Sequence, residues 1–388
     1  MCAERAAPEV VPVTGFAKEP FAPLADVFAR LVGAQGRGGA ALAIYHNGGL
    51  VVDLVGGDYR QDSLQLLFSV TKPITAIASA MAHAAGLIDL DAPLADYWPA
   101  FDRPSTAVIS ARSVLGHRSG LAALDERLSL QQLLDAVDED AIETQEPYWV
   151  PDTAHGYHGF TFGTLLNGAF RRTVGKTVGE YVDEHVAKRL GLDLWIGAPE
   201  DQLARIERIH YDSPKLTPGR VEHLRESRIP LSTTSQLAQQ SDLYNDPSMA
   251  RACWPSSSGV AGARDLARLL YATLHDVDGD RLLTEDETRA MLATRSNGLD
   301  RVLGVISHFG SGVQRPFPQL PLLGANSFGH EAAGGSAAVA DPERDIAVGY
   351  TTNIYPSMNG ASVGFLALMP AIQHCLTERA DDASVVGA

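Results

Sequence analysis

The chain has 388 residues, of which 45% are hydrophobic and 20% charged, a composition that excludes a disordered or fibrous protein. Its 31 lysines and arginines stand against 47 aspartates and glutamates, and the resulting formal charge of -16 repels phosphate backbones and anionic lipids. Since no basic block reverses that charge locally, we expect neither a nucleic-acid nor a membrane partner.

The N-terminal residues are charged and lead into prolines, whereas a signal peptide has an apolar stretch of about 7–15 residues there. No apolar run approaches the roughly 20 residues of a membrane helix. The three cysteines, Cys2, Cys253 and Cys375, form no CxxC pair, which indicates reduced thiols rather than a disulfide framework. These features predict a soluble, cytoplasmic protein.

The first predicted elements are a helix and two hairpin strands, over residues 21–32, 40–45 and 50–55. The strands flank Asn47-Gly48, a pair typical of a tight turn between antiparallel strands. A second helix pattern follows Ser69, and Gly86 occupies the position where a helix ends.

Helical patterns dominate the middle of the chain, over residues 128–137, 162–174, 178–190 and 234–243. Two further helices are predicted, over residues 263–274 and after Thr284, where Glu287 completes a capping box. Strand-like runs cover residues 301–307, 336–340 and 346–352, and a closing helix pattern covers residues 363–376.

Strands near both ends of the chain, with helices between them, predict an α+β fold. Its antiparallel sheet is built from both ends of the chain and flanked by helices, and a mostly helical domain is inserted. We expect a discontinuous sheet domain at residues 1–86 and 252–388, and the helical domain at residues 87–251.

The first candidate for chemistry is Ser69-Val70-Thr71-Lys72. Residues three apart on a helix share a face, so the Lys72 amine comes beside the Ser69 hydroxyl, and a serine becomes a strong nucleophile when a neighbouring base removes its proton. Pro73 is tolerated only near a helix start, which places Ser69 at the opening of the helix. The alternative interpretation is a helix cap followed by a solvated lysine.

The second candidate is Tyr157, in a loop before the helix at residues 162–174. A tyrosine acts as a general base only when cations depress its pKa from about 10, and Lys72 is a cation that would do so. The alternative is a half-buried loop aromatic. Tyr211 is a rival, although it lies in a proline-rich loop without comparable flanks.

The third candidate is a run of small residues around His330 that leads into a strand, Phe-Gly-His-Glu-Ala-Ala-Gly-Gly-Ser at residues 328–336. Small residues let backbone N–H groups approach a ligand closely. The alternative is an ordinary glycine-rich start of a strand with a satisfied histidine.

In this order, the three motifs resemble the serine β-lactamase and penicillin-recognising superfamily, most closely its class C-like esterases, the family VIII carboxylesterases. The resemblance extends over about residues 20–375 and rests on residues 69–72, 86–93, 97–99, 115–121, 149–158, 255–259 and 328–342. It implies a β-lactamase/transpeptidase-like fold. It also implies that Ser69 is the acylated nucleophile, that Lys72 activates it, and that Tyr157 matches the tyrosine that is the acylation base and the proton donor to the leaving group. Whether Lys72 or Tyr157 is the acylation base in this chain stays open.

The resemblance further implies an oxyanion hole formed by the backbone N–H groups of Ser69 and Ala333, with Ala333 on a strand. His330, Glu331 and Ala332 take the positions of the third motif, which binds substrate. The lactamases carry lysine at the position of His330. HxG and KTG motifs have glycine at the position of Ala332, and the added methyl group of the alanine is expected to narrow the oxyanion pocket or to shift the strand.

A further departure is Gly159, which stands where class C lactamases carry an asparagine that helps to bind a β-lactam. The departures at Gly159 and Ala332 favour esters over β-lactams. The sequence therefore predicts a serine carboxylesterase that acts on short-to-medium acyl or bulky-acid esters without a cofactor. A β-lactamase or D-alanyl peptidase, an acyltransferase and a non-catalytic binding homologue remain alternatives, and the oligomeric state stays open.

Two other patterns are weaker. His117 and Ser119 are candidates for a catalytic supporting role, but a histidine bonded to backbone at a helix end is the simpler interpretation. Residues 276–280 resemble a calcium loop, yet Arg281 stands where its sharp turn needs glycine, so we interpret them as an acidic turn. We predict no metal site.

Overall fold

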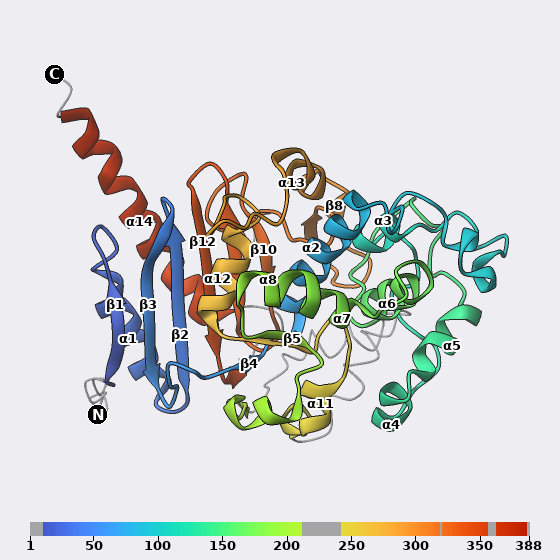
Figure 1. Ribbon diagram of the computed structural model, residues 1–388, viewed down its shortest axis with the longest axis horizontal. Helices are drawn as coiled ribbons and strands as arrows, with labels where there is room; N and C mark the ends of the chain where they lie inside the picture. The colour runs from blue at the N-terminus through green and yellow to red at the C-terminus, as the bar shows by residue number, and fades with distance from the viewer. Residues whose placement is uncertain (1–10, 212–241, 319, 356–361, 386–388) are drawn as a thin grey trace, which may run out of the picture.

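The computed structural model describes residues 11–211, 242–318, 320–355 and 362–385. Its central sheet has six antiparallel strands in the order β1-β3-β2-β12-β11-β10. These strands come from the two ends of the chain: β1 (Val13–Ala17), β2 (Gly39–His46), β3 (Gly49–Gly57), β10 (Phe328–Glu331), β11 (Ala337–Asp341) and β12 (Ile346–Thr352). The predicted α+β fold is confirmed, and Figure 1 shows the sheet at one end of the molecule and α3 to α6 at the other.

The β2–β3 hairpin turns at the residues that the sequence indicated. Asn47 and Gly48 both have left-handed φ angles, 47° and 84°, and two such residues in succession match the twist of the flanking strands. β12 is confirmed over its predicted length, and each of its residues is buried because helices cover both faces of the sheet.

Three helices form these layers: α1 (Leu24–Gln35), α12 (Ala263–Tyr271) and α14 (Val363–Val385). Alternation along β12 sends Val348 into the core shared with α1 and α14, and Ala347 into the core shared with α12. Gly349 lets α12 approach closely, because a Cβ there would lie 2.1 Å from the Ala263 carbonyl oxygen.

The remaining α-helices lie mostly beyond β10: α2 (Thr71–Ala84), α3 (Ala111–Leu115), α4 (Leu130–Leu134), α5 (Val137–Thr144), α6 (Thr161–Thr173), α7 (Val178–Val182), α8 (Lys188–Leu190), α11 (Pro247–Arg251) and α13 (Glu285–Leu292). Most residues of α2 are buried. The predicted helix at residues 128–137 is wrong as a single element, because Ala136 is left-handed (φ 59°) and separates α4 from α5. The capping box of Thr284 and Glu287 is confirmed at the start of α13.

Several short strands were not predicted, among them β1 and the three-stranded sheet formed by β4 (Gln65–Leu66), β7 (Gly259–Ala261) and β5 (Leu194–Ile196). The run at residues 301–307 is wrong in its first part, since residues 301–305 form a turn between β8 (Ser296–Leu299) and β9 (Ile306–Phe309). Most of the predicted helix at residues 234–243 lies outside the described residues, as does Cys2. The domain boundaries stay predictions.

None of the helices in the described ranges combines the length and the hydropathy that crossing a membrane requires.

Candidate active site

Ser69 lies in the 3₁₀ turn η1 (Phe68–Val70), directly before α2. The residue before it, Phe68, has a left-handed φ of 49°, a conformation that is rare for a bulky residue and marks a backbone held by its surroundings. The Phe68 ring packs against Gly334, where an added Cβ would lie 2.3 Å from a ring carbon. The turn that presents Ser69 is thus in contact with the segment that follows β10.

Lys72 is fully buried one helical turn after Ser69, with its Nζ 3.5 Å from the Ser69 Oγ. Its amine donates to the carbonyl oxygens of Gly159 at 2.9 Å and Ser256 at 3.0 Å. Burial lowers the pKa of Lys72 from 10.5 to about 7, so a large share of this amine is neutral near neutral pH. A neutral amine beside a serine is able to accept its proton.

Tyr157 reaches the same oxygen from the loop before α6, and its hydroxyl donates to the Ser69 Oγ at 2.7 Å. The Lys72 Nζ lies 4.8 Å from the centroid of its ring. The sequence predicted that Lys72 depresses the tyrosine pKa, and this is wrong: burial raises the pKa of Tyr157 well above its usual value. The rival Tyr211 packs instead against Tyr355, with 5.5 Å between ring centroids.

His330 is buried on β10, with its Nε2 3.5 Å from the Tyr157 hydroxyl. Its Nδ1 lies within hydrogen-bond distance of the Glu331 carbonyl oxygen, an acceptor only, so Nδ1 carries the proton and Nε2 presents a lone pair to Tyr157. Burial lowers the pKa of His330 to about 3, with Lys72 as a second cause, and the ring is neutral at physiological pH.

The rest of the third motif differs from the expectation in one respect. Ala333 lies in the turn between β10 and β11 rather than on a strand, because β10 ends at Glu331. Ala332 is buried, and its N–H donates to the Ser336 carbonyl at 2.9 Å, which closes the turn. The Glu331 side chain accepts the Ser362 N–H at 3.0 Å, and burial raises the pKa of Glu331 to about 7.

His117 and Ser119 bond to residues next to Tyr157 in its loop, in agreement with the interpretation of His117 as a histidine bonded to backbone. The His117 Nδ1 accepts the His158 N–H at 3.1 Å, and its carbonyl accepts the Gly156 N–H at 3.0 Å. The Ser119 Oγ lies 2.6 Å from the His158 Nε2. Sequence reasoning missed Asp300, whose carboxylate accepts the Tyr157 N–H at 3.0 Å; no local pattern around Asp300 indicates a contact 143 residues away.

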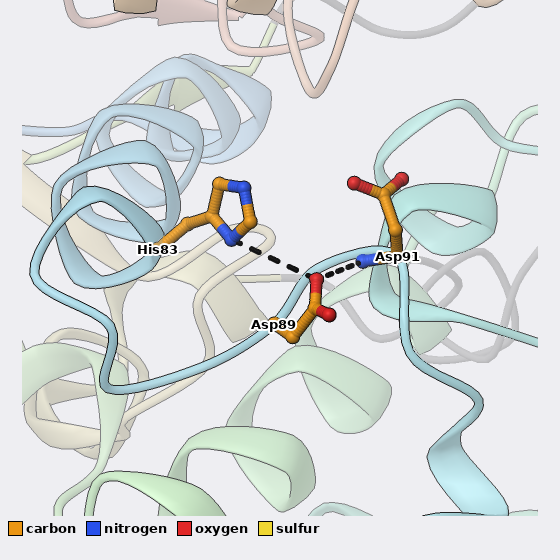
Figure 2. Close-up of side chains that lie close together, drawn as sticks. All are labelled: His83, Asp89 and Asp91. Carbon is orange, nitrogen blue, oxygen red and sulfur yellow. Dashed lines mark hydrogen bonds and ion pairs between the residues drawn. The ribbon is translucent and has the colours of Figure 1, made fainter.

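One group of described side chains has the spacing of metal ligands: His83, Asp89 and Asp91 (Figure 2). Both Asp91 carboxylate oxygens are already bound to Arg112, at 3.0 and 2.8 Å, and one Asp89 oxygen accepts the Asp91 N–H at 3.0 Å. We therefore assign no metal to this group.

The segment that resembles a calcium loop is a turn, closed by the Gly279 N–H donating to the Asp276 carboxylate at 2.7 Å. Asp280 pairs with Arg189 at 2.6 Å. These bonds agree with the interpretation of residues 276–280 as an acidic turn.

Comparison with known proteins shows which family the chain resembles. The model of the Beta-lactamase family matches residues 24–368. The chain is 29% identical to the esterase/beta-lactamase LipL of Mycobacterium tuberculosis, over 94% of this chain and 89% of that protein. It also resembles the solved structure of EstA from Arthrobacter nitroguajacolicus Rue61a (27% identity, TM-score 0.85, 95% of this chain and 100% of that one). A family VIII carboxylesterase structure is similar at 26% identity and TM-score 0.82, over 94% of this chain and 100% of that one.

Proposed function

We propose, from the premise that the chain belongs to the beta-lactamase family, that it is a serine hydrolase that cleaves carboxylic esters through an acyl-enzyme. One observation carries the proposal: the Ser69 Oγ lies 2.7 Å from the Tyr157 hydroxyl and 3.5 Å from the Lys72 amine. A serine oxygen shared by a phenol and a partly neutral amine is equipped for nucleophilic catalysis.

In the proposed acylation, the Ser69 Oγ attacks the ester carbonyl carbon while its proton passes to the neutral Lys72 amine. The backbone N–H groups of Ser69 and Ala333 receive the oxyanion. The bond to the alcohol then breaks, and the alcohol takes a proton from the Tyr157 hydroxyl, which Lys72 restores. Water repeats the sequence on the acyl-enzyme and releases the acid. Tyr157 thus serves as the proton donor, and Lys72 as the base.

The supporting residues favour an ester over a β-lactam. At Gly159 the chain offers only a backbone carbonyl, which already accepts the Lys72 amine, and no side-chain amide. Hydrolysis of β-lactams is the second candidate, because LipL carries both activities in its name. We further propose a small-molecule ester as the partner and the cytoplasm as the location.

The test is to assay p-nitrophenyl butyrate and nitrocefin side by side and to map a phosphonate ester inhibitor by mass spectrometry. Ester turnover with the phosphonate on Ser69 supports the proposal. Strong nitrocefin turnover with negligible ester turnover reverses the order of the two candidates. An added alcohol that diverts the acyl group from water indicates an acyltransferase, and a protein that neither turns over nor takes the label is a binding homologue.

The pH profile tests the assignment of Lys72 as the base. Only the neutral amine accepts a proton, so we expect kcat/KM to rise about tenfold per pH unit below 7 and to level off above it. Tyr157 adds no ionisation near pH 7, because burial raises its pKa. Glu331 also has a pKa of about 7, so Glu331→Gln is the control: an acid limb that disappears in this variant contradicts the assignment to Lys72.

Ala332→Gly tests whether the altered third motif narrows the site. Because the Ala332 methyl group is buried rather than directed into open space, we expect no gain on bulky esters or nitrocefin. We expect instead a loss of about 1 kcal/mol in the free energy of unfolding, from added backbone freedom and a small cavity. Urea denaturation and rates on two esters of different size measure both effects, and a gain on the bulky ester would restore the view that this methyl obstructs the pocket.

A further inference from the structure

Asp300 is a fully buried carboxylate that follows directly after β8. Four donors satisfy it: its Oδ1 accepts the N–H groups of Tyr157 at 3.0 Å and of Val302 and Leu303 at 2.8 Å, and its Oδ2 accepts the Ser307 hydroxyl at 3.0 Å. A buried carboxylate with this many donors is held in one orientation.

Two of these donors, the N–H groups of Val302 and Leu303, belong to the turn between β8 and β9, and the third, the Ser307 hydroxyl, lies on β9. The fourth, the Tyr157 N–H, lies 143 residues away. A second bond joins the same two segments, from the Arg301 N–H to the His155 carbonyl at 3.1 Å. The His155 Nε2 in turn lies 3.0 Å from the Ser307 Oγ. The segment from Asp300 to Ser307 is therefore hydrogen-bonded to the backbone of the loop that carries Tyr157.

We propose that Asp300 is the positioning residue of Tyr157: its carboxylate clamps the tyrosine loop onto the β8–β9 turn and so fixes the phenol oxygen against Ser69. This inference rests on the proposed function. Asp300 touches neither Ser69 nor the reacting atoms in this arrangement; it acts through the backbone N–H of Tyr157. A phenol that must serve Ser69 at 2.7 Å tolerates little displacement, because a shift of about 1 Å at a reacting group can cost about 10²-fold in rate.

The negative charge of Asp300 also supports the role of Tyr157 as a proton donor, because it raises the pKa of the phenol. Burial has the largest effect on the pKa of Tyr157 and raises it; the hydrogen bond with Ser69 comes next and lowers it, and the negative charges of Asp300 and Glu331 follow and raise it. The other titratable groups around the ring are Lys72, His117 and His330, of which both histidines have lowered pKa values. Asp300 thus helps to keep the proton that the phenol gives to the leaving alcohol.

A double-mutant cycle separates positioning from general support of the fold. Asp300→Ala and Asp300→Asn are each made in the wild type and in Tyr157→Phe, and the rate constant of Ser69 phosphonylation is measured in all six proteins. Asp300→Ala removes the clamp and the charge, and we expect about 10²-fold slower labelling. Asp300→Asn retains an acceptor for the Tyr157 N–H and removes the charge, so its loss should be smaller. In the Tyr157→Phe background, both changes should cost less than about threefold, because the group they position is absent.

Asp53→Asn is the matched control. Asp53 is a buried carboxylate on β3 that pairs with Arg264 of α12, and three strands separate β3 from β10 in the sheet. This substitution should leave the labelling rate within about twofold. Equal losses in both Tyr157 backgrounds overturn the inference alone, as does unchanged labelling in Asp300→Asn and Asp300→Ala. If Asp300→Ala fails to fold, the Asp300→Asn arm decides. A wild type that takes no label overturns the proposed function together with the inference.

Discussion

Ser69→Ala should abolish ester turnover, with a loss of about 10⁴-fold or more, because no other group in the site replaces the nucleophile of a covalent mechanism. The fold should survive, since the change removes one partly exposed oxygen and leaves the Tyr157 hydroxyl beside His330. Initial rates on p-nitrophenyl butyrate, together with the intact mass after phosphonate treatment, measure the effect.

Ser79→Ala, on the helix α2 that follows Ser69, is the matched control, because the Ser79 hydroxyl is buried and donates to the Thr75 carbonyl at 2.8 Å, away from Ser69. It should retain turnover within about threefold. Turnover near the wild-type level in Ser69→Ala, or phosphonate on another residue, would remove Ser69 from the mechanism.

Lys72→Met should change activity and stability in opposite directions. Turnover should fall by about 10³-fold or more, because the base is lost while the long side chain is kept. The folded protein releases the Lys72 proton near pH 7, whereas the unfolded chain keeps it to about pH 10.5. Below pH 7 this difference lowers the free energy of unfolding of the wild type by roughly 5 kcal/mol. Lys72→Met avoids that loss, but part of its gain is offset because two carbonyl groups lose their hydrogen-bond donor.

The pH dependence of unfolding gives this prediction its sign. Between pH 7 and 10 the unfolded wild type binds more protons than the folded one, so its free energy of unfolding should rise relative to Lys72→Met by about 1.4 kcal/mol per pH unit. Urea titrations at several pH values measure it. Lys176→Met, at a lysine paired with Glu184 on the surface, is the control for a change from lysine to methionine outside the site. A constant difference between the wild type and Lys72→Met would mean that Lys72 stays charged.

Local patterns were predictable where a few neighbouring residues determine the conformation. The Asn47-Gly48 turn, the capping box at Thr284 and the Ser69–Lys72 spacing each depend on contacts within four residues, so the sequence shows them directly. β1 was not predicted because it is short, lies at the edge of the sheet and has mostly exposed side chains, so its sequence shows little alternation of apolar and polar residues.

Features set by tertiary contacts were beyond the sequence. Tyr157 was found through family resemblance, but its pKa is set first by burial, which raises it and which only the folded structure reveals. Asp300 has no local signature, because its importance arises from one N–H that the fold brings to it. Ala136 likewise favours a helix by its residue type, so the left-handed backbone conformation that ends α4 there could not be predicted from it.

The central pairing of the sheet, β2 with β12, joins the two ends of the chain, and the Gly39 N–H bonds to Asn353 across 314 residues. A nascent polypeptide stalled on the ribosome before residue 330 would hold Ser69, Lys72 and Tyr157 without the strand that completes their surroundings. Contacts of such high sequence separation form late in folding. The proposed hydrolysis therefore depends on strands that are synthesised late, and we expect it only after β10 to β12 have joined the sheet.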